Sequence, residues 1–171
     1  MKKIDNKGFT LVELMIGIAI MSLLSISIVT FIGYGSRNYR KAQEEVTLQV
    51  EAQTIINQLS DLIIEAYNVK YQDDMLIIYH NDAKYFITLE TSNNQLLYEK
   101  VKTDELSSGD KKLFGQYVTS LEIVDTGEND LNKTIQISIN LKKNNTNYSI
   151  KEQYVTIRNK IKKISVSYKS L

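Results

Sequence analysis

The chain has no cysteine, no proline and no tryptophan, and it has one histidine among 171 residues. Without cysteine there is no disulfide, no thiolate zinc site and no cysteine nucleophile. A single histidine argues against histidine-based triads and multi-histidine metal sites. The 21 basic and 20 acidic residues nearly cancel, so the basic excess typical of nucleic-acid binders is missing. With 43% apolar residues, the composition suits a folded domain rather than a disordered chain.

One long run of the chain has almost no charge. Residues 9–32 read FTLVELMIGIAIMSLLSISIVTFI, and their single charge is on Glu13. A helix that rises about 1.5 Å per residue needs about 20 apolar residues to cross a bilayer. We therefore expect a transmembrane helix here. A buried core helix is the alternative, but the run is long for a chain of this size. A secretory signal peptide would have a shorter apolar region followed by small residues.

The segment before this run, MKKIDNKG, carries three lysines and one aspartate. Three more cations follow the run, at Arg37, Arg40 and Lys41. The positive-inside rule alone therefore leaves the orientation open. The rule gives a cytoplasmic N-terminus and an ectodomain outside if the positive charges of the leader and its free amine outweigh those that follow the run.

Residues 7–14, KGFTLVEL, closely resemble the N-terminus of type IV prepilins and type II secretion pseudopilins. In that family a dedicated membrane peptidase cuts after a glycine. The new first residue, usually phenylalanine, is N-methylated, and glutamate stands at the fifth mature position. The resemblance implies cleavage between Gly8 and Phe9, methylation of Phe9 and an assembly role for Glu13.

The same resemblance implies a structural subunit rather than an enzyme, and no cofactor. Its implied partners are other pilin or pseudopilin subunits, the prepilin peptidase, the inner-membrane assembly platform and the cytoplasmic membrane. Nucleic acid would be a partner only in a competence (DNA-uptake) pseudopilus. The implied destination after the membrane is a pilus at the cell surface.

Physical chemistry supports a special role for Glu13. A carboxylate inside a transmembrane segment is costly and usually marks function. Cleavage after Gly8 would create a cation close by, the amine of Phe9. In a staggered filament, Glu13 of one subunit can meet this amine on its neighbour and set the axial register. The alternative for Glu13 is a carboxylate near the interface that snorkels to water.

The sequence after the run predicts a hinge and then an amphipathic helix. Two glycines in Gly33-Tyr34-Gly35-Ser36 favour a break. From Arg37 to about Asn68, apolar residues at helical spacing form a stripe: Ala42, Val46, Ile55, Ile56, Leu59, Leu62, Ile63 and Ala66. Acidic residues are expected on the opposite face: Glu44, Glu45, Glu51, Asp61 and Glu65.

The remaining sequence predicts β-strands. Residues 75–79, 85–90 and 96–101 read as a three-strand meander, with turns at residues 80–82 and 92–94. Residues 102–115 read as a looser segment, and strands resume at 118–124, 135–141 and 148–157. Ile135 to Leu141 alternate apolar and polar residues, so one face is expected to be buried. Ile164, Val166 and Tyr168 alternate in the tail and suggest a further short strand.

These elements define an α+β fold with a long N-terminal helix, transmembrane in its first half, packed on an antiparallel sheet. The expected divisions are a cytoplasmic leader (1–8), a transmembrane assembly helix (9–32), an amphipathic helix (33–68) and a β domain (69–171). The order resembles J-type minor pseudopilins and Firmicute minor pilins, in the stretch MLIIYHNDAKYFITLETSNNQLLYEK and the late Ile157-Arg158-Asn159.

Other candidate sites are weak. An acidic loop contains Asp125, Asn129 and Asp130, whose oxygens suit calcium, but its spacing does not match an EF-hand and a solvated turn fits better. Asp73-Asp74 is expected to be a helix-to-strand turn, and His80 an exposed hairpin residue. No acid, base and nucleophile form a recognisable set. The main alternative to a pilin-like subunit is a membrane-tethered extracytoplasmic binding module or sensor.

Overall fold

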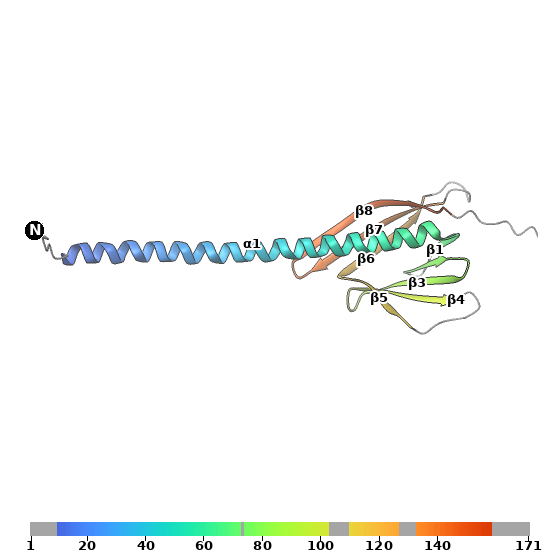
Figure 1. The fold of residues 1–171 in the computed structure, drawn as a ribbon, viewed down its shortest axis with the longest axis horizontal. Helices are drawn as coiled ribbons and strands as arrows, with labels where there is room; N and C mark the ends of the chain where they lie inside the picture. The colour runs from blue at the N-terminus through green and yellow to red at the C-terminus, as the bar shows by residue number, and fades with distance from the viewer. Residues whose placement is uncertain (1–9, 73, 103–109, 127–132, 159–171) are drawn as a thin grey trace, which may run out of the picture. The chain divides into compact units, whose positions relative to one another are not determined.

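The structure, a computed structural model, describes residues 10–72, 74–102, 110–126 and 133–158 (Figure 1). These residues form one α-helix and eight β-strands. The chain divides into two compact units, Met1–Gln43 and Glu44–Leu171. The helix α1, Leu11–Glu65, supplies the regular structure of the first unit and continues into the second.

The glycines after the apolar run do not interrupt α1. The helix continues through Gly33 and Gly35, so the expected break at residues 33–36 is wrong. A glycine costs a helix about 1 kcal/mol relative to alanine, which weakens the helix without ending it. The expected end near Asn68 is also wrong, because α1 ends at Glu65 and Asn68 already begins a strand.

The buried stripe of α1 lies in the second unit. Its members are Leu48, Ala52, Ile55, Ile56, Leu59 and Ile63. Val46 does not belong to this stripe, contrary to expectation, and is 59% exposed. Residues two positions apart on a helix lie about 200° apart around its axis, so Val46 points away from the side that buries Leu48. The expectation that Glu44 and Glu51 face away from the domain is wrong. The Glu44 carboxylate accepts hydrogen bonds from the side chains of Asn144 and Thr146. The Glu51 Oε1 accepts a hydrogen bond from the Gln116 backbone N–H at 2.7 Å.

The first sheet is a five-stranded antiparallel meander in the order β1-β2-β3-β4-β5. Its strands are β1 (Asn68–Gln72), β2 (Met75–Tyr79), β3 (Ala83–Glu90), β4 (Gln95–Lys102) and β5 (Lys112–Gln116). The three predicted central strands are confirmed, whereas the two edge strands were missed. Asp74 therefore lies between β1 and β2, with φ 57°, and not between the helix and a strand; Asp73 lies outside the described residues.

The second sheet has three antiparallel strands, β6 (Val118–Asp125), β7 (Thr134–Lys143) and β8 (Thr146–Thr156). The alternation predicted for β7 is confirmed, since Ile135, Ile137, Ile139 and Leu141 are all at most 1% exposed. Asn144, in the tight turn between β7 and β8, has a φ of 52°. Asparagine tolerates this left-handed conformation better than most residues.

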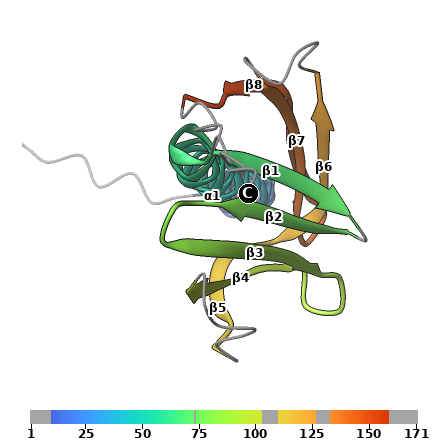
Figure 2. The same cartoon turned by 90° about the vertical axis from the view of Figure 1, so that its right-hand side faces the viewer.

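One hydrophobic core joins the two sheets to the C-terminal part of α1, which Figure 2 shows end-on beside the strands. It contains Ile55 and Leu59 of α1, Ile78 and Ile87 of the first sheet, and Ile137 of the second. This arrangement confirms the α+β architecture, with the helix packed against antiparallel sheet. The tail residues predicted to form a strand, from Ile164 to Tyr168, lie outside the described residues.

His80 is not the exposed hairpin residue that the sequence predicts. It is 9% exposed, and its Nε2 lies 2.8 Å from the Leu62 carbonyl oxygen, near the end of α1. The ring also packs edge-on against Tyr85, with centroids 4.9 Å apart. His80 therefore ties the β2–β3 turn to the helix.

Candidate processing and assembly site

The first turn of α1 is held by a reciprocal pair of side chains, Thr10 and Glu13. The Glu13 Oε2 accepts hydrogen bonds from the Thr10 backbone N–H at 3.0 Å and from its hydroxyl at 2.9 Å. In return, the Glu13 backbone N–H donates to Thr10 Oγ1 at 3.3 Å. This is a capping box, in which threonine before the helix and glutamate three residues later satisfy each other's backbone donors. It places the Glu13 carboxylate at the N-terminal end of the helix, in its first turn.

Sequence reasoning missed Thr10. It treated Glu13 as a lone carboxylate in an apolar segment, although the signal is present as Thr10-Leu11-Val12-Glu13, a threonine followed by glutamate at the third position. This spacing is a known helix-start pattern. Gly8 and Phe9, the residues of the expected cleavage, lie outside the described residues.

The apolar run after Glu13 has the surface of a membrane helix. Its large apolar side chains are between 53% exposed at Ile20 and 80% exposed at Phe31. The helix is long and apolar enough to cross a membrane, and none of its most apolar stretch is buried. A buried core helix is therefore not what these residues form. A signal sequence near the N-terminus can also form an apolar helix that meets these criteria, so the motif before the run is needed to distinguish the two.

Hydroxyl groups within the run have partners in their own helix. The hydroxyls of Ser22, Ser25, Ser27 and Thr30 each donate to the carbonyl oxygen four residues earlier, at 2.8 to 3.0 Å. In hydrocarbon an unsatisfied polar group is costly. These bonds let the four polar side chains lie in lipid without water.

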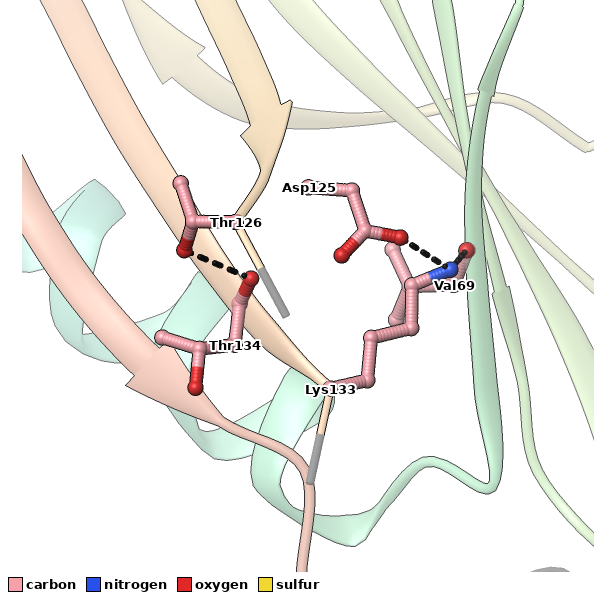
Figure 3. A network of polar contacts seen from close by, with 5 residues as sticks. All are labelled: Val69, Asp125, Thr126, Lys133 and Thr134. Carbon is pink, nitrogen blue, oxygen red and sulfur yellow. Dashed lines mark hydrogen bonds and ion pairs between the residues drawn. The ribbon is translucent and has the colours of Figure 1, made fainter. Parts of the chain in front are cut away.

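The acidic loop that contains the candidate calcium ligands begins beside a lysine side chain, which already supplies a positive charge. Lys133 Nζ lies 2.8 Å from Asp125 Oδ2 and donates to the Val69 carbonyl oxygen at 2.7 Å (Figure 3). Asn129 and Asp130 lie outside the described residues. Within the described ranges, no three His, Asp or Glu side chains gather in a group that could hold a metal ion. The contacts of Lys133 with Asp125 and Val69 join the two sheets.

Comparison with known families bears on the N-terminal segment. Residues 4–29 match the family described as the prokaryotic N-terminal methylation motif. The match includes Gly8, Phe9, Thr10 and Glu13 and ends within α1. No curated protein and no solved structure matches the chain significantly.

The methylation motif indicates a precursor of the type IV pilin or pseudopilin kind, which is a structural class of protein. Such a motif implies assembly with other pilin subunits and processing by a prepilin peptidase. Together with the exposed apolar helix, it fits a membrane-anchored pilin. The match does not extend into the β domain.

Proposed function

We propose that the protein is a minor pilin or pseudopilin, cut after Gly8, methylated at Phe9 and assembled through its N-terminal helix into a type IV pilus or pseudopilus. The observation that carries the proposal is the methylation motif at residues 4–29, with Glu13 in the first turn of an exposed apolar helix. Before cleavage the subunit stands in the cytoplasmic membrane with its leader inside and its β domain outside. Assembly then takes it into the filament.

The proposed role of Glu13 is to pair with the Phe9 amine of a neighbouring subunit. Two protons on Thr10, the backbone N–H and the hydroxyl, are directed at Glu13 Oε2. Both of these bonds between described residues use Oε2. A carboxylate has two oxygens and about four acceptor positions, so Oε1 can accept from an incoming amine while Oε2 keeps its bonds. The capping box would then orient the carboxylate without blocking the charge pair.

Resemblance to J-type minor pseudopilins and Firmicute minor pilins favours a minor component near the filament tip. The single long α1 and the small two-sheet domain support a pilin-like subunit. The absence of cysteine argues against pilins that close a C-terminal loop with a disulfide. Pilus, secretion pseudopilus and DNA-uptake pseudopilus share the N-terminal features, so the proposal covers this group.

The test is the Glu13→Ala variant, followed in the membrane fraction and in sheared or extracted filaments. We expect normal membrane insertion and loss from filaments, because an alanine cannot pair with the amine. Ser22→Ala is the control, since its hydroxyl donates to the Ile18 carbonyl oxygen within α1. Filaments that contain Glu13→Ala at the wild-type level would contradict the assembly role.

A membrane-tethered binding module or sensor would behave differently. Its helix would be a permanent anchor, and the chain would keep its leader and stay out of filaments in the wild type as well. In that case the Glu13→Ala variant would insert into the membrane normally, and the substitution would not change its absence from filaments. The state of the wild-type N-terminus therefore separates the two functions.

A further inference from the structure

Strand β2 carries apolar side chains on both faces of the first sheet. Leu76 and Ile78 point into the core and are 0% exposed. Met75, Ile77 and Tyr79 alternate with them, so they face the other way, where they are half-buried. An antiparallel sheet with one solvated face normally carries polar residues on that face. The outer face of the first sheet, the side away from α1, is therefore unusually apolar.

The neighbouring strands extend this outer face. The register places Phe86 of β3 beside Ile77, and it places Leu97 and Leu113 on the same row as Met75. Leu113 of β5 is 48% exposed. The helix and the second sheet pack on the opposite, inner face. A contiguous apolar patch with a polar rim marks an interaction site.

A hollow of about 210 Å³ opens on the outer face beside β3 and β4. The residues that line it include Phe86, Thr88, Leu97 and Val101. Val101 is 1% exposed, although it does not belong to the hydrophobic core that α1 shares with the two sheets. The outer face therefore has a small apolar cluster of its own, with room for an apolar side chain from outside.

One row across the outer face has opposite charges at its two ends. Its members, in order from β1 to β4, are Lys70, Ile77, Phe86 and Glu99. A second copy of the sheet can lie on the first, related by a two-fold axis that runs along the strands between β2 and β3. Each Lys70 then faces the Glu99 of the other copy, and each Ile77 faces the other Phe86. The row is therefore complementary to itself.

The flanking rows agree with this pairing. Tyr79 and Lys84 are neighbours on β2 and β3, so each Lys84 would lie over the Tyr79 ring of the other copy. A lysine over a tyrosine ring is favourable, and Lys70 already lies 5.9 Å from the Tyr79 ring centroid within the subunit. On the other side of the charged row, Met75 of the second copy would lie over Thr88, at the hollow.

The proposed axis also suits two subunits that share a membrane. In Figure 1, β3 and β4 extend along the same direction as the C-terminal part of α1, the part that packs on the sheets. A two-fold axis along the strands preserves this direction in both copies. The C-terminal parts of the two helices would therefore run the same way, as two subunits anchored in one membrane require.

We propose that the outer face of the first sheet binds the same face of a second copy of this chain, with Lys70 of each subunit paired with Glu99 of the other. The Ile77 side chain of the second copy would cover Phe86 and the hollow beside it. The contact spans four strands about 4.8 Å apart and about five residues of each strand, which is small for a stable interface in solution. The pair therefore forms where α1 holds both subunits in one membrane and raises their effective concentration.

Cross-linking of the full-length chain in phosphatidylcholine vesicles tests the proposal. The protein has no cysteine of its own, so Thr88→Cys introduces one thiol on the outer face, close to the axis. Two such thiols would face each other across the gap of about 10 Å between packed sheets, which a short bis-maleimide can span. Gln136→Cys is the matched control, because Gln136 is also half-buried and faces outward from the middle strand of its sheet. We expect Thr88→Cys to cross-link at least about fivefold more than this control.

Charge reversal tests the orientation of the pair. In the Thr88→Cys chain, Lys70→Glu and Glu99→Lys each place like charges opposite one another in a self-pair, and we expect each to lower cross-linking about fivefold. When the two variants are mixed, every charge at these positions meets an opposite charge on the other chain. We expect cross-links between the two variants, distinguished by mass, to return to within about twofold of the Thr88→Cys level. Recovery in the mixture also shows that both variants are folded.

Three results would overturn the proposal. Equal cross-linking of Thr88→Cys and Gln136→Cys would mean that the chains meet only by random collision. Single reversals that lose nothing, or a mixture that recovers nothing, would mean that the two faces do not pair in this orientation. Loss of the cross-link in Glu13→Ala would place the contact in the membrane helix. We expect Glu13→Ala to leave the cross-link unchanged, so this pairing and the assembly role of Glu13 can fail independently.

Discussion

Glu13 and Thr10 show how the role of one residue depends on another close to it in the chain. The composition of the apolar run singles out Glu13, and the structure adds that its carboxylate is oriented by Thr10 at 2.9 to 3.0 Å. An anion at the N-terminal end of a helix is also favoured by the helix dipole. Thr10 is therefore a positioning residue for the Glu13 carboxylate.

Thr10→Val keeps the shape of the side chain and removes the hydroxyl. Loss of an N-cap contact costs a helix about 1 kcal/mol, so we expect the Glu13 amide to exchange hydrogen about fivefold faster in detergent micelles. Thr30→Val is the control, since its hydroxyl bonds to Ile26 in the middle of the run. An unchanged exchange rate at Glu13 would show that the capping box contributes nothing to the start of the helix.

Tyr71 gives a pH-dependent prediction. Burial, followed by the charge of Asp74, raises the pKa of its phenol in the folded state. A raised pKa means that the unfolded chain loses the proton first, so the contribution is present below about pH 10 and is lost as pH rises through the folded pKa. We expect wild type to lose more unfolding free energy than Tyr71→Phe between about pH 9 and pH 12.

Chemical denaturation at a series of pH values measures this difference. Tyr154→Phe, on the exposed edge strand β8, controls for removal of a tyrosine hydroxyl. Parallel pH curves for wild type and Tyr71→Phe would contradict the assigned environment of Tyr71.

At the scale of elements, the close approach of β5 to α1 explains why a strand was missed. The sequence KLFGQ carries a glycine and lacks clear alternation, so it reads as a loose segment. In the structure Gly115 is buried against Ile55 of α1, and a Cβ at this position would collide with the Ile55 side chain. The glycine marks close packing between elements that lie far apart in the chain, which no local pattern reveals.

Gly115→Ala should destabilise the β domain by about 1–3 kcal/mol, because the added methyl overpacks the core at Ile55. Urea unfolding of the single variant, of Ile55→Ala and of the double variant measures the coupling. We expect the alanine at position 115 to cost much less when Ile55 is already alanine. Additive effects in the double variant would mean that the two residues do not press on each other.

Other elements follow from the sequence more directly. β2, β3, β4 and β7 are predictable because β-branched and aromatic residues lie between clear turn residues. β1 was missed because it follows the helix after two residues, Ala66 and Tyr67, so that the helical pattern seems to continue. The continuity of α1 through Gly33 and Gly35 was also missed. Glycine content is a local signal, and it does not show that the helical segments before and after these glycines form one continuous helix.

At the scale of the whole molecule, the two units are predictable to different degrees. Length and hydropathy are enough to indicate the membrane helix, and a short motif indicates the processing class. In the β domain the sequence indicates most strands and the α+β class. It does not indicate the division into two sheets, because that depends on which strand edges remain unpaired after the core forms. The contacts of Lys133 and Tyr71 across this division link residues that are 64 and 50 positions apart.

The mass and N-terminal sequence of the protein, extracted from the membranes and filaments of cells with an active prepilin peptidase, test the central claim most directly. Removal of eight of the 171 residues leaves 163, and we predict a chain of that length that begins with N-methylated Phe9. An intact chain that still begins at Met1 in such cells would contradict processing and, with it, the pilin-like function.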